Sequence, residues 1–185
     1  GTTNSSYTIF DKVPPSDFTV QDVITVGENS IANAWNSTNS AININIPVSD
    51  DESLDSGRVQ IIAKVANNDF ENLDSYLFFQ SNDLNNSKIV SVSESLVESI
   101  SGFSENDTIT ISAIIYDVPG NMTIGSESNT KLVINQSIPI IINSNIESDF
   151  SDSSLAGVDN IITLIFETDT EIIIPSVTIS GQEAI

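Results

Sequence analysis

Apolar residues either alternate with polar ones or form short continuous runs over most of the first 135 residues, and helical periodicity is scarce. β-Branched runs of this kind, bounded by clusters of Asn, Asp, Ser and Gly, are typical of strands. Seven such runs in about 120 residues favour an all-β fold, and in particular an antiparallel β-sandwich. The predicted strands are residues 18–26, 41–48, 58–65, 76–80, 88–92, 107–117 and 130–135.

The clearest alternation lies in the segment AININIPV, residues 41–48. Because successive side chains of a strand point to opposite faces, Ile42, Ile44 and Ile46 are expected to face the core. Asn43 and Asn45 are then expected to face water.

One segment follows a different period. SESLVESI, residues 93–100, places Leu96, Val97 and Ile100 at helical spacing after a serine. This spacing predicts one or two helical turns, which we expect to cross between the two sheets.

A pattern near residue 125 also occurs at the start of the chain, with an offset of 124 residues from Gly1 to Gly125 and from Pro15 to Pro139. Both copies continue with a polar stretch, a strand, an acidic or amide residue and the proline. The recurrence indicates a fragment of a tandem repeat array. The expected divisions are the last strand and linker of a preceding repeat (1–13), a complete sandwich (14–136) and the N-terminal part of a following domain (137–185).

The last part of the chain fits an incomplete domain. Strands are expected at residues 161–167 and 175–181, around an acidic turn. A seven-stranded sandwich needs more chain than residues 139–185, so we expect open strand edges and one uncovered face.

The amino-acid composition excludes several classes of function. The 26 acidic residues and 5 basic residues give a net charge of -21, which repels nucleic acid and anionic membranes and attracts cations. Histidine and cysteine are absent, so thiolate and imidazole chemistry is excluded. No apolar run approaches the ~18 residues of a membrane span. We therefore expect neither a nucleic-acid partner nor membrane insertion of this fragment.

Four segments together resemble the Ig-like repeats of large bacterial and archaeal cell-surface proteins of the adhesin type. They are AWNSTNSAININIPV, GRVQIIAKV, VPPSDFTV and ITISAIIYDVPGN, the last ending in Asp-x-x-Gly-Asn. The tail, NIITLIFETDTEIIIPSVTISGQEA, resembles the opening half of a second subtype of such repeats. The chain departs from the family at Pro119, where a small residue is usual, and this change should stiffen the turn.

The resemblance implies a non-catalytic, extracellular spacer or adhesive role at the cell surface. The partners it implies are neighbouring repeats of the same chain, with surface glycans or proteins bound by other parts of the parent protein. Two other hypotheses stay open: a carbohydrate-binding accessory module of a secreted protein, and a segment of a surface-layer subunit. Aromatic residues make up only 6% of the chain and most lie within or beside strands, which disfavours sugar binding.

Asp117, Gly120 and Asn121 have two interpretations. They form either a tight turn capped by the Asp side chain or part of a calcium site. Ca²⁺ takes six to eight oxygen ligands, and in an Ig-like sandwich three acidic segments would meet at one end. The predicted metal ligands are Asp11, Asp50, Asp51, Asp117 and Asn121.

Two further features are weaker indications of function. Trp35, the single tryptophan, is expected to pack across the sandwich edge and not to stack on a sugar. N-x-S/T sequons, which also arise by chance in so polar a chain, occur at Asn4, Asn36, Asn85, Asn106, Asn121 and Asn135.

Overall fold

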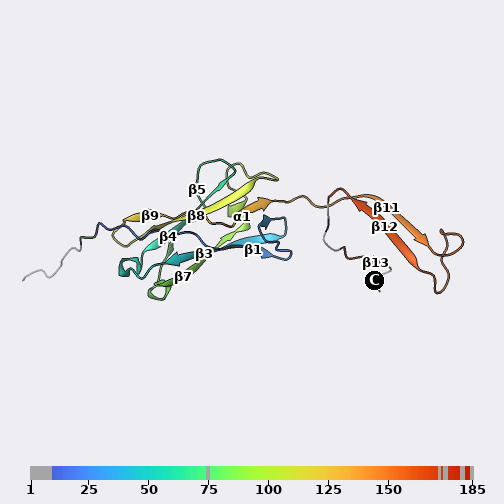
Figure 1. Ribbon diagram of the computed structural model, residues 1–185, viewed down its shortest axis with the longest axis horizontal. Helices are drawn as coiled ribbons and strands as arrows, with labels where there is room; N and C mark the ends of the chain where they lie inside the picture. Colours follow the sequence, from blue (N-terminus) through green and yellow to red (C-terminus); the bar gives the residue numbers. More distant parts are fainter. Residues whose placement is uncertain (1–9, 74–75, 171, 173–174, 180–181, 184–185) are drawn as a thin grey trace, which may run out of the picture. The chain divides into compact units, whose positions relative to one another are not determined.

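The structure is a computed structural model that describes residues 10–73, 76–170, 172, 175–179 and 182–183. Strands predominate in these residues and helix is confined to short turns, which confirms the all-β prediction. The chain divides into two compact units, residues 1–136 and 137–185, and each is described by itself (Figure 1). The predicted last strand of a preceding repeat falls mainly on residues 1–9, which lie outside the described residues.

Two sheets make up the first unit in a β-sandwich-like arrangement. The smaller has three antiparallel strands in the order β1 (Val23–Gly27), β3 (Asn39–Val48) and β7 (Asn86–Ser93). The larger is built on the long antiparallel pair of β4 (Arg58–Val65) and β8 (Thr108–Tyr116). Its other strands are β2 (Ala34–Trp35), β5 (Glu71–Asn72), β6 (Leu77–Phe78), β9 (Met122–Ile124) and β10 (Leu132–Ile134).

The two sheets share one hydrophobic core. Ile42, Ile44 and Ile46 of β3 are fully buried, as their alternation predicts, and they belong to the same cluster as Ile61 and Ile111 of the larger sheet. The intervening Asn43 and Asn45 lie on the other face but are half-buried and not fully exposed to water. Neighbouring strands on both sides of β3 account for this partial cover.

The short helix forms where the helical spacing predicts it. α1 (Glu94–Val97) follows β7 directly and lies in the connection from the smaller sheet to β8 of the larger one. Val97 and Ile100 are buried in the core, and Leu96 packs against it. Two 3₁₀ turns complete the local structure, η1 (Glu52–Leu54) and η2 (Ser81–Asp83).

The strand predicted at 18–26 is divided between the two sheets. Its second half is β1, which pairs with β3, whereas Thr19 forms a parallel bridge with Ser126 next to the larger sheet. Phe18 packs on Gly125, where an added Cβ would come within 2.4 Å of the phenyl ring. A side chain at residue 125 would therefore displace Phe18 and the segment that carries it.

Because the predicted strand 18–26 is divided between the two sheets, the N-terminal segment, residues 11–21, runs parallel to residues 121–128. Five hydrogen bonds join the two segments. Three are donated by side chains: Asn121 Nδ2 to Asp11 O (3.4 Å), Thr123 Oγ1 to Pro15 O (2.5 Å) and Ser128 Oγ to Gln21 O (2.5 Å). The other two are backbone bonds, Ser126 N–H to Phe18 O (2.8 Å) and Val20 N–H to Ser126 O (3.1 Å). We call this set of bonds the parallel clamp.

The chain passes from one end of β8 to the other as it crosses the first unit. Asp11 contacts Asn121, just beyond the last residue of β8. Gln136 is held by Glu98 and Glu105, both of which precede the first residue of β8. We refer to these two places as the Asp117 end and the Gln136 end.

The second unit is formed by two separate antiparallel pairs. β11 (Ile141–Ser148) pairs with β12 (Ile162–Thr168), and β13 (Thr178–Ile179) pairs with β14 (Gln182–Glu183). β12 lies where a strand is predicted at 161–167. β13 lies within the predicted strand at 175–181, although residues 180–181 are outside the described part.

No described residue of the second unit is buried. Large apolar side chains such as Ile146 and Ile165 are 67% and 52% exposed. An open hollow of about 480 Å³ is lined by Ile141, Leu164 and Phe166 among others. This unit therefore has open apolar surface and no closed core within its described residues.

Limited proteolysis should leave a resistant fragment of about residues 14–136, because a buried core protects only the first unit. Early cleavage is expected between residues 136 and 140 and within 137–185. Proteinase K or thermolysin suits the test, since only five Lys and Arg residues serve trypsin, and mass spectrometry would locate the cuts. An intact 185-residue product at high protease would contradict this prediction.

Candidate functional site

The turn after β8 is organised around the Asp117 carboxylate, which is fully buried. Its Oδ1 accepts the backbone N–H groups of Gly120 (2.7 Å) and Asn121 (2.6 Å), and its Oδ2 accepts Asn121 Nδ2 (2.7 Å). Gly120 has a φ of +104°, which a residue without Cβ adopts without strain. The structure thus shows the Asp-capped turn that the spacing of these residues suggests.

This turn also holds neighbouring segments in place. Asn121 Nδ2 donates to Asp11 O of the N-terminal segment as well as to Asp117. The backbone N–H of Val118 donates to Ser53 O in η1 (3.0 Å). Three segments that are distant in sequence therefore meet at the Asp117 end, as expected from the sequence.

The predicted calcium ligands occupy these segments, but their carboxylates are engaged separately. Asp11 Oδ1 accepts the N–H of Val13 and Asp51 Oδ1 accepts the N–H of Ser53, both at 2.9 Å, while Asp50 is exposed. No three acidic side chains gather as a metal-binding group in the described part of the chain. The observed arrangement fits a set of capped turns better than a calcium cage, and calcium binding stays a prediction.

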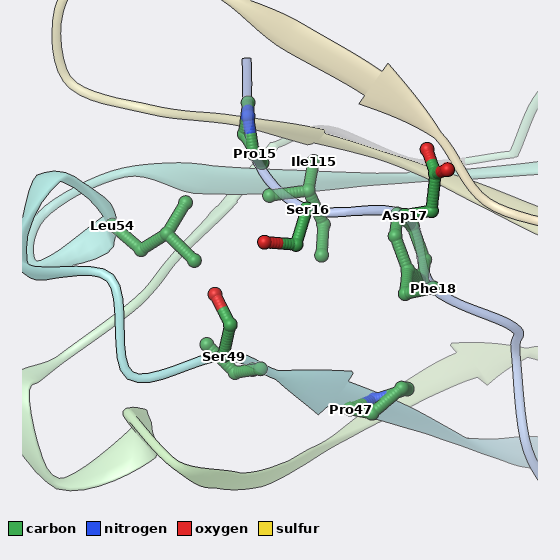
Figure 2. A pocket seen from close by; sticks show the side chains of 9 residues that line it. Pro15, Ser16, Asp17, Phe18, Pro47, Ser49, Leu54 and Ile115 are labelled. Atoms are coloured by element: carbon green, nitrogen blue, oxygen red, sulfur yellow. The ribbon is translucent and has the colours of Figure 1, made fainter. Parts of the chain in front are cut away.

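A cavity of about 220 Å³ lies beside this end of the first unit, between the N-terminal segment and the ends of β3 and β8. Figure 2 shows the hydroxyl groups of Ser16 and Ser49 pointing into the space next to Leu54, while the carboxylate of Asp17 points away. Ser49 Oγ has no hydrogen-bond partner among the described residues. The cavity is smaller than the ~300 Å³ at which ligand pockets usually begin, so it suits solvent better than an organic substrate.

Trp35 is fully buried, and its Nε1 donates to Glu98 Oε1 (3.2 Å). This confirms its packing interpretation, because a buried ring cannot stack on a sugar.

The sequon asparagines differ in how their side chains are used. Asn36 and Asn121 donate their amide groups to hydrogen bonds within the protein. Asn85, Asn106 and Asn135 are exposed, and Asn4 lies outside the described residues.

Sequence reasoning missed an aromatic stack around the only arginine. The guanidinium carbon of Arg58 lies 4.7 Å from the ring centroid of Tyr76 and 4.4 Å from that of Tyr116. Only the strand register, which pairs Arg58 with Tyr116 on β8 and with Phe78 on β6, brings these side chains together. The rarity of arginine in the chain was the one signal that could have drawn attention to the position.

No family model matches the chain, and neither a curated protein nor a solved structure matches it significantly. Among the described residues, every helix is too short or too polar to cross a membrane.

Replacing Asp117 with Ala should lower the free energy of unfolding by at least about 2 kcal/mol, because three partly buried hydrogen bonds to a charged acceptor are lost. Asp117→Asn should cost less, since it keeps one carbonyl oxygen. Asp50→Ala is the matched control on the exposed part of the same end and should change stability by less than about 0.5 kcal/mol. Urea denaturation measures all three. A loss below about 1 kcal/mol for Asp117→Ala would contradict the role of the carboxylate as the centre of the turn.

Proposed function

We propose that the first unit is an Ig-like structural repeat that acts as a spacer in the stalk of a large extracellular, adhesin-type surface protein. Its direct partners would be neighbouring repeats of the same chain. The observation that carries this proposal is that the chain joins the unit at the Asp117 end and leaves it at the Gln136 end. A unit joined at opposite ends adds its length to a series.

The length that each repeat would add to a stalk can be derived from the length of β8. Its nine residues span about 30 Å at ~3.4 Å per residue, so each repeat would add at least this much to a stalk. The absence of a histidine or cysteine nucleophile and base in the sequence is consistent with a non-catalytic role.

The parallel clamp gives the same unit resistance to tension. The N-terminal segment leaves the clamp at the Asp117 end, and residues 121–128 lead on through β10 to the Gln136 end. Pulling on the two ends would therefore slide the two parallel segments past each other. Hydrogen bonds between segments that slide past each other share the force and must break together. Hydrogen bonds between segments that are pulled apart from one end break one at a time.

Single-molecule stretching of concatenated copies of residues 11–136, which include every bond of the parallel clamp, should show one unfolding step per copy. The contour length released should be about 400 Å, the reach of roughly 120 extended residues less their folded span. The double variant Thr123→Val, Ser128→Ala removes two side-chain bonds of the clamp. It should lower the unfolding force, together with an equilibrium loss of about 1–3 kcal/mol.

Ser99→Ala is the control for this experiment, because its hydroxyl bonds to Leu96 O (2.8 Å) away from the clamp. Its unfolding force should equal that of the unmodified unit. Equal losses of force in the control and the double variant would argue against the clamp as the force-bearing element. Unfolding in many small steps would argue against the spacer itself.

Calcium would stiffen the Asp117 end if the acids there share an ion. Bound Ca²⁺ should then raise the melting temperature, with a stabilisation of about 2.7 kcal/mol at 100 times its Kd. Mg²⁺ at matched ionic strength controls for screening of the net charge of -21, and it should substitute poorly because it prefers a tight octahedron.

Asp50→Asn sharpens the calcium test, because this exposed side chain can lose its charge with little effect on the fold. The difference between melting temperatures in Ca²⁺ and in EDTA should shrink in this variant. Equal melting temperatures in Ca²⁺ and Mg²⁺ would leave Asp117 as a turn cap alone.

A further inference from the structure

The outer face of the larger sheet carries a cross-strand row of side chains that contrasts with the rest of this acidic molecule. Phe78, Arg58, Tyr116 and Met122 lie in register on β6, β4, β8 and β9. Tyr76 completes the group, because it contacts both Arg58 and Tyr116. We call these five residues the Arg58 surface.

The rings of both tyrosines contact the guanidinium group of Arg58. Both ring centroids lie within 5 Å of its carbon, and the rings meet edge to face at 89° with centroids 5.5 Å apart. Stacking on aromatic rings uses the flat faces of a guanidinium group and leaves the N–H groups of its rim free to donate in the plane. Because the two rings are perpendicular, the flat guanidinium group can stack on only one of them, and contact with both restricts where it can lie.

No acidic partner for Arg58 is found within the described part of the chain. The ion pairs there are made by Lys64, Lys88 and Lys131. Among the described residues Arg58 is thus a cation without an acidic partner, in a chain whose net charge is -21. Its geometry suits a carboxylate, which guanidinium binds through two parallel hydrogen bonds.

The side chains around Arg58 offer apolar contact to the same ligand. Phe78 is 63% exposed, Met122 51% and Tyr76 45%. Burial and the hydrogen bond with Tyr76 raise the pKa of the Tyr116 hydroxyl, against the opposing effect of Arg58, so this group stays neutral at physiological pH. The surface thus combines exposed rings, the neutral Tyr116 hydroxyl and one cation.

We propose that the Arg58 surface binds a saccharide that carries a carboxylate, with the sugar ring stacked on Phe78 and Tyr76 and the carboxylate paired with Arg58. Charge complementarity selects the carboxylate. A sugar fits better than an acidic peptide, because peptides usually add to a strand edge or enter a groove, whereas these side chains project from a sheet face. The net charge of the molecule disfavours a densely charged polyanion, so the ligand carries few carboxylates per sugar.

The test is isothermal titration of residues 14–136 and of the full chain with a short probe, a trisaccharide that contains one uronic acid, against its neutral counterpart. The acidic probe should bind and the neutral one should bind at least tenfold more weakly. Arg58→Lys keeps the charge but loses the paired, stacked geometry, and it should weaken binding about tenfold, the equivalent of roughly 1.4 kcal/mol. Phe78→Ala should weaken binding as well.

Lys131→Gln is the matched control, because it removes a cation that pairs with Glu127 (3.6 Å) and does not belong to the Arg58 surface. Its affinity for the probe should be unchanged. Thermal melting of each variant checks the fold, and Phe78→Ala keeps the test decisive if Arg58→Lys fails to fold, since Phe78 is largely exposed.

The proposal would be overturned by no binding of the acidic trisaccharide, by equal binding of the neutral one, or by binding that neither Arg58→Lys nor Phe78→Ala weakens. Tighter binding of an acidic peptide than of the saccharide would also overturn it. The stretching experiment is independent of these results, so the spacer role and the saccharide site can fail separately.

Discussion

Mutual burial of two rows of β-branched side chains holds the first unit together. The inner face of β3 presents Ile42, Ile44 and Ile46 to the inner faces of β4 and β8, and each row is removed from water only while the other is in place. The chain has no cysteine, so no disulfide can replace this packing. Every other feature depends on it, because the Asp117 turn, the parallel clamp and the Arg58 surface are all attached to strands that the core positions.

The strands whose two ends are marked by polar clusters could be predicted well. β4 begins and ends where the run RVQIIAKV does, and β8 differs from its predicted bounds by one residue at each end. The division of residues 18–26 could not be predicted, because it depends on Phe18 packing against Gly125, more than 100 residues away. β11 was missed because adjacent isoleucines followed by polar residues do not alternate.

The candidate site was predictable to the level of segments and not of atoms. The spacing of Asp117, Gly120 and Asn121 indicates a capped turn, and the acidic segments do meet at one end of the first unit. Whether carboxylates converge on an ion depends on which backbone N–H each one accepts, and that is settled by local turn geometry. Arg58 illustrates the same limit, because the sequence shows its rarity but only the register shows its neighbours.

The position of Trp35 makes the first unit easy to observe in solution. It is the only tryptophan, it is fully buried, and it shares the Glu98 carboxylate with the side chain of Gln136 at the Gln136 end. Its fluorescence therefore reports from one known place, two hydrogen bonds from the residue where the chain leaves the first unit. Residues 137–185 contain no tryptophan and contribute nothing to that signal. The protein thus carries a built-in spectroscopic probe that separates events in the first unit from events in the second without any added label.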